Sequence, residues 1–222
     1  MLSNQILTKI ALLNALLIIG LSIYVFVSIQ IKPAFDTYYC FAGANEYLNH
    51  HFDWNQINPG IKHYLFYRCT NLLPLTYLEV FLQGILQFLG ITNLHTMYQL
   101  LCGLNFVMFW MTIYLVYRLI QRRFSQYLAT GFTLLILLFW PFFVILDMFY
   151  TDWPAMLMTV GILVNYDAFL HIRRQRLKRV ILIIICAVSG TLMKSNVLIV
   201  LLAIIIHYWL RTSSFKNGLF WH

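Results

Sequence analysis

Apolar runs of about 20 residues recur along the chain, and a helix needs this length to cross a hydrocarbon core about 30 Å thick. Residues 6–29 form the first run. The segment 95–210 carries five more, including one over 127–146, so we expect about six transmembrane helices. The stretch before residue 210 is interrupted around Lys194, which predicts two short helices with a turn between them. Residues 211–222 form a short tail.

Residues 30–94 form the long polar segment of the sequence. Near its end, residues 77–89 are apolar but short for a span, and they carry Glu79, Gln83 and Gln87 at every fourth position. This spacing puts three polar groups on one face of a helix, which favours an interfacial helix over a transmembrane one. We therefore expect an outer loop that contains interfacial helices.

The overall composition agrees with this pattern. Hydrophobic residues make up 61% of the chain and charged residues 10%, and the mean hydropathy is +0.76. Soluble domains carry roughly a quarter charged residues, so a water-facing surface cannot be built from so few charges. The predicted fold class is all-α, a polytopic membrane helix bundle that forms a single transmembrane domain over residues 1–222.

The net charge of +8 could indicate nucleic-acid binding, so the positions of the basic residues decide its meaning. They lie between the apolar runs. With the amino terminus inside, about eleven basic residues fall on inner segments and four on outer ones, and this bias sets orientation. We expect a multi-pass protein of the plasma membrane with both termini cytoplasmic, in contact with the lipid bilayer and with no nucleic-acid partner.

Asp36 follows the first span closely and is the first candidate for chemistry. Its carboxylate could act as a general base or as a metal ligand at the membrane surface. The alternative is that Asp36 merely caps a surface helix. A helix beginning there would align these residues on one stripe: Asp36, Tyr39, Gly43, Glu46, His50 and Asp53.

Asp152 and Lys194 are further candidates near predicted span ends. Asp152 can cap the helix that starts there, with Pro154 in its first turn, and it also places a carboxylate at the outer surface. Lys194 could hold a phosphate of a lipid carrier, or it could simply extend its ammonium group to the headgroups. The sequence contains no Walker loop, GxGxxG fingerprint, GxSxG elbow or HExxH helix.

The order of these elements resembles the GT-C superfamily of polytopic membrane glycosyltransferases, which use lipid-phosphate-linked sugars. The likeness covers nearly the whole chain, although each motif is short. It rests on five segments: Pro33-Ala34-Phe35-Asp36, residues 42–48, Phe88-Leu89-Gly90, Phe149-Tyr150-Thr151-Asp152 and Gly190-Thr191-Leu192-Met193-Lys194.

This resemblance implies that Asp36 is the catalytic base or a metal-site residue. It implies that Tyr150, Asp152 and Lys194 help to bind donor or acceptor, and Glu46 is a further substrate-binding candidate. The resemblance does not identify a metal ligand set, so the metal is unknown, and a divalent cation is a candidate cofactor. Members of the superfamily usually have more spans, so this chain is similar to their amino-terminal module, and a partner subunit could supply the carboxy-terminal part.

Two other classes remain as alternatives to a hexosyltransferase. A non-catalytic membrane subunit, or a protein that binds carrier lipid during polysaccharide assembly in the cell envelope, would fit the short chain. A small transporter would need charged groups at mid-membrane and an internal repeat, and no convincing repeat is visible. The effect of Asp36→Asn on sugar transfer distinguishes an enzyme from an accessory subunit.

Overall fold

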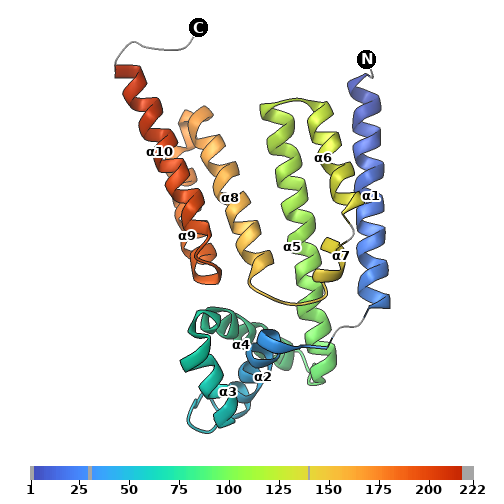
Figure 1. Ribbon diagram of the computed structural model, residues 1–222, viewed down its shortest axis with the longest axis vertical. Helices are drawn as coiled ribbons and strands as arrows, with labels where there is room; N and C mark the ends of the chain where they lie inside the picture. The colour runs from blue at the N-terminus through green and yellow to red at the C-terminus, as the bar shows by residue number, and fades with distance from the viewer. Residues whose placement is uncertain (1–2, 30–31, 140, 217–222) are drawn as a thin grey trace. The chain divides into compact units, whose positions relative to one another are not determined.

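The computed structural model describes residues 3–29, 32–139 and 141–216, and every regular element in these ranges is a helix (Figure 1). The chain divides into two compact units, Met1–Pro154 and Ala155–His222, each described by itself. The helices are α1 (Asn4–Ser28), α2 (Phe35–Asn49), α3 (Pro59–His63), η1 (Tyr64–Arg68), η2 (Thr70–Leu72), α4 (Leu73–Phe88), α5 (Leu94–Arg123), α6 (Gln126–Leu138), α7 (Pro141–Ile145), α8 (Asp152–His171), η3 (Arg173–Gln175), α9 (Arg176–Met193) and α10 (Val197–Lys216).

Three of the described helices, α1, α5 and α8, are long and apolar enough to cross a membrane. The number rises to four if Pro59–Arg68 and Thr70–Phe88, which are bent by 98° relative to each other, form one broken span. The prediction of six transmembrane helices is therefore not confirmed, whereas the all-α class is. The predicted run over 127–146 is divided into α6 and α7, because Pro141 has no backbone N–H to continue a helix.

In the first unit, α1, α5 and α6 lie side by side (Figure 1). Polar side chains join them. Asn14 of α1 donates through Nδ2 to Thr133 Oγ1 of α6 at 3.1 Å, and both residues are buried. Trp110 of α5 donates to Ser22 Oγ of α1 at 3.3 Å. Helices in lipid associate in this way, because hydrogen bonds and close packing replace the hydrophobic effect.

The outward surface of α1 has the opposite character. Large apolar side chains such as Leu12, Leu16 and Val27 are at least 59% exposed. Polar residues inside and apolar residues outside are compatible with a helix in contact with lipid.

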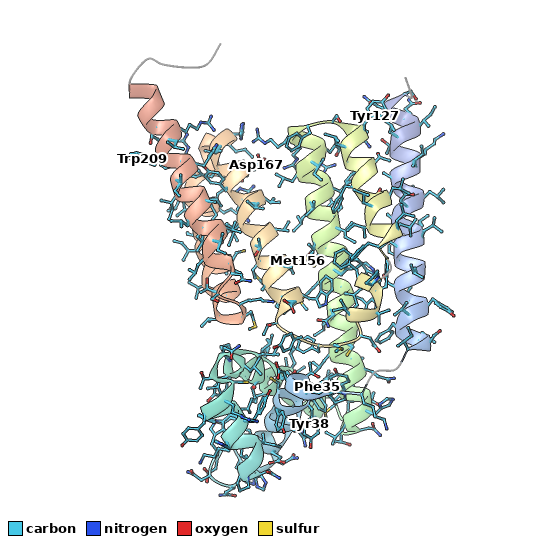
Figure 2. All side chains as sticks on the ribbon, viewed as in Figure 1. Phe35, Tyr38, Tyr127, Met156, Asp167 and Trp209 are labelled. Carbon is cyan, nitrogen blue, oxygen red and sulfur yellow. The ribbon has the colours of Figure 1, made fainter. Side chains whose placement is uncertain are left out.

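Helices α2, α3 and α4 gather at the end of the first unit where α1 finishes and α5 begins (Figure 1). Gln83 of α4 donates through Nε2 to the Phe41 carbonyl of α2 at 3.2 Å. Gly43 of α2 allows close packing, because a Cβ atom there would lie 2.7 Å from Leu65 Cδ1. Figure 2 labels Phe35 and Tyr38 on α2 at this end, while Tyr127 of α6 lies at the opposite end of the unit.

The second unit consists of most of α8 followed by the hairpin of α9 and α10. Its core contains Ala155, Ile162, Ala187 and Val197. A Cβ atom at Gly190 would approach Met158 Cβ to 2.9 Å, so this glycine permits close packing of α9 and α8. The hairpin turns at Lys194, as the interrupted apolar run predicted.

Candidate functional site

Asp36 lies in the first turn of α2 and is half-buried. The N-cap of α2 is Ala34, whose own side chain makes no capping hydrogen bond. The Ala34 N–H donates to Thr37 Oγ1 at 3.0 Å, and the Thr37 hydroxyl donates back to the Ala34 carbonyl at 2.8 Å. Asp36 is therefore not the N-cap residue of α2, and its carboxylate accepts hydrogen bonds from residues outside this helix.

Two tyrosine hydroxyls donate to the two oxygens of Asp36. Tyr64, in the π-helical turn η1, donates to Oδ1, and Tyr150, between α7 and α8, donates to Oδ2 at 2.8 Å. Hydrogen bonds to a charged acceptor are roughly twice as strong as neutral ones. A carboxylate has about four lone-pair positions, so it can still accept a hydroxyl from a bound molecule.

The same contacts govern the protonation of both tyrosines. The hydrogen bond to Asp36 raises the pKa of Tyr64, and burial together with the bond to Asp36 raises the pKa of Tyr150. Both phenols therefore remain protonated donors at neutral pH.

An aromatic ring stacks on Tyr64, and the backbone just before Asp36 has an unusual conformation. The ring of Tyr39 stacks on Tyr64 with centroids 3.8 Å apart and planes 13° from parallel. Immediately before Asp36, Phe35 has a φ of 50° and is 86% exposed. A left-handed conformation at an aromatic residue is strained, and such strain is concentrated at functional sites.

The Tyr150 side is held by α5. Asn105 donates through Nδ2 to the Leu146 carbonyl at 3.1 Å and to the Met148 carbonyl at 2.6 Å. Cys102 donates through Sγ to the Asp147 carbonyl at 3.3 Å. These bonds fix the segment that leads to Tyr150, so α5 positions this tyrosine without touching Asp36 in the described contacts.

Glu46 lies on α2 but does not join this cluster. Glu46 is ten positions after Asp36, which corresponds to about 15 Å along a helix. Its Oε2 accepts the Asn58 N–H at 2.6 Å, and Asn58 is the N-cap of α3. Glu46 therefore tethers the start of α3 to α2, and its substrate-binding role stays a prediction.

The two remaining predicted site residues lie at helix ends. Asp152 is exposed in the first turn of α8, two residues after Tyr150. Lys194 belongs to the second unit, where its N–H donates to the Gly190 carbonyl at 2.8 Å and ends α9. The structure thus unites Asp36 with Tyr150 among the predicted residues, and the roles of Asp152 and Lys194 remain predictions.

Within the described parts of the chain, no three His, Cys, Asp or Glu side chains lie where they could hold a metal ion. Asp53, another carboxylate of the loop, accepts the Asn55 N–H at 2.8 Å and the Gln56 amide at 3.0 Å. The Asn55 N–H lowers the pKa of Asp53. The Asp53 carboxylate thus accepts both hydrogen bonds within a local turn, and a divalent cation at Asp36 stays a prediction.

Sequence reasoning missed Tyr64 as a partner of Asp36. The two residues are 28 positions apart and meet because α2 packs against α3 and η1. Nothing in the spacing distinguishes Tyr64 from the other tyrosines of the loop. A long-range contact of this kind carries no periodic signal.

Over the described ranges the protein is all-helical, and three to four of its helices are long and apolar enough to cross a membrane. No family model matches the chain, and no curated protein or solved structure matches it either. The resemblance to GT-C enzymes therefore stays a prediction that rests on the motifs.

Proposed function

We propose that this chain is a membrane glycosyltransferase that moves a sugar from a lipid-phosphate-linked donor to an acceptor at the outer membrane face. One observation supports this most: the Asp36 carboxylate is held by the hydroxyls of Tyr64 and Tyr150 and is only half-buried. A carboxylate that is fixed in orientation and still accessible has what a general base needs.

In the proposed reaction, the acceptor hydroxyl attacks the anomeric carbon of the donor sugar. Its proton passes to Asp36 as the new carbon–oxygen bond forms. The bond between the anomeric carbon and the phosphate oxygen breaks, and the lipid phosphate leaves with the electron pair. A single displacement inverts the anomeric centre. Tyr64 and Tyr150 keep Asp36 oriented toward the acceptor.

We further propose that the chain crosses the membrane six times. In this arrangement α1, α5 and α8 each cross once. Helices α6 and α7 together form one further crossing, and α9 and α10 form one each. An amino terminus in the cytoplasm would put α2, α3 and α4 at the outer face, together with Asp36. The bias of basic residues toward the other segments supports this orientation.

The test measures incorporation of radiolabelled sugar from polyprenyl-phosphate donors into membrane acceptors by the purified chain. The proposal expects transfer by the wild type and its loss in Asp36→Asn, with Asp167→Asn in the second unit as the matched carboxylate control. Transfer that is equal in all three proteins would reject Asp36 as the base. No transfer by the wild type, with activity restored by a partner subunit, would favour the accessory role.

A further inference from the structure

The first unit has an apolar groove far from Asp36, between α1 and α5. It encloses about 410 Å³. Ala11 and Ala15 of α1 and Trp110 of α5 are among its lining residues, and Thr133 of α6 contributes as well. The small alanine side chains create the space, because larger residues at these positions would fill the gap between the two helices.

The groove opens sideways rather than into the protein. Leu12 and Tyr114 line it and are 61% and 60% exposed. In a membrane-embedded helix bundle of this composition, a cavity with an exposed apolar edge would face the lipid chains. Its occupant must therefore be apolar along most of its length.

The length of the groove corresponds to one leaflet. Lining residues on α1 extend from Thr8 to Ile19, which is about 16 Å along the helix. Half of a hydrocarbon core of about 30 Å is close to this value. A single lipid tail, which spans one leaflet, matches this depth better than a transmembrane helix, which spans both.

Two basic residues lie next in sequence to residues that line the groove. Lys9 follows the lining residue Thr8, and Arg118 follows the lining residue Tyr117. Both basic side chains are exposed, and Arg118 donates only a long bond of 3.5 Å to Gln121 in the described contacts. No acidic residue occurs in α1, α5 or α6, so these helices do not neutralise the charge.

We propose that this groove binds an anionic phospholipid, with one tail between α1 and α5 and the headgroup phosphate at Lys9 and Arg118. Basic pockets between transmembrane helices recognise anionic lipid headgroups in this way. The proposed lipid site is separate from the proposed site of sugar transfer. The groove is lined by residues of α1 from Thr8 to Ile19, whereas Asp36 comes after the carboxyl end of α1. Lipid binding there would hold α1 against α5.

The test is native mass spectrometry of the purified full chain in neutral detergent, titrated with dioleoylphosphatidylglycerol or with dioleoylphosphatidylcholine. We expect tighter binding of the anionic lipid. The double variant Lys9→Gln/Arg118→Gln should weaken it about 30-fold and leave the zwitterionic lipid unaffected. The matched control is Lys62→Gln/Arg68→Gln, which removes two charges from the polar loop and should leave the affinity for both lipids unchanged.

A second variant tests the position of the tail. Ala15→Phe fills the groove and should weaken binding of both lipids, whereas Leu16→Phe, on the exposed surface of α1, should not. Equal affinity for the two lipids would overturn the proposal. So would lipid binding that survives Ala15→Phe, or a groove occupied by a second copy of the chain, seen as a dimer without bound lipid.

Discussion

Glu79 of α4 provides the sharpest test of the packing behind the candidate site. Its side chain is fully buried, and both carboxyl oxygens lack a hydrogen-bond partner among the described residues. Burial raises the pKa of Glu79 well above its ordinary value of 4.5. Nearby, burial also raises the pKa of the Cys40 thiol. The folded protein therefore keeps the Glu79 proton to a higher pH than the unfolded chain does.

The consequence is a stability that falls as pH rises. Above the ordinary value, the unfolded chain releases the Glu79 proton while the folded chain keeps it, so the folded state binds more protons. The contribution of the Glu79 proton to the free energy of unfolding is fully present below pH 4.5. It is lost as pH rises toward the raised pKa of the folded state, by about 1.4 kcal/mol per pH unit. For a chain of this size, this corresponds to about 3 to 6 °C in Tm per pH unit.

The assay is thermal unfolding of the detergent-solubilised protein, followed by tryptophan fluorescence from pH 5 upward. Glu79→Gln should remove this component of the slope, and Glu79→Met should also raise stability at pH 7.5 by about 1 to 3 kcal/mol, because it removes unpaired buried oxygens. Asp53→Asn, in the exposed turn, should leave the slope above pH 5 unchanged. A wild-type slope retained in Glu79→Gln would refute the buried-acid explanation.

Three further variants test the packing and the contacts of Asp36. Tyr150→Phe should lower sugar transfer roughly 5- to 30-fold without loss of folded protein, because one bond to a half-exposed carboxylate disappears; an unchanged rate would separate Tyr150 from function. Gly43→Val should lower Tm through a loss of about 1 to 3 kcal/mol, since its side chain would collide with Leu65; unchanged unfolding would contradict that packing. Asn105→Ala should cost about 2 to 4 kcal/mol by leaving two carbonyls unpaired, and transfer should fall with it; a change in neither would show that Asn105 does not position Tyr150.

Much of the helix layout could be predicted from apolar run lengths. The run 6–29 corresponds to α1, and the break near Lys194 separates α9 from α10. Run length did not determine how many helices cross, because α6 ends at Leu138, before Pro141. A proline inside an apolar run was a visible signal for this division.

The candidate site was only partly predictable. Asp36 and Tyr150 were both proposed from short motifs, but their hydrogen bond joins residues 114 positions apart. The motifs identified each of the two residues separately, but they did not indicate that the residues are in contact. Tyr64 and the buried Glu79 depend on how α2 packs against η1 and α4, which sequence periodicity does not encode. On α4 the polar side chain of Glu79 is buried, whereas the aromatic side chain of Phe81 is exposed.

The most direct test of the central claim compares the transfer rate of the wild type and of Asp36→Asn at saturating lipid-phosphate donor, with donor binding measured in the same samples. A general base contributes about 10²- to 10⁴-fold. The account predicts a fall of at least about 100-fold in transfer, with donor binding retained and Asp167→Asn unaffected. A rate within a few-fold of the wild type would contradict the assignment of Asp36 as the base.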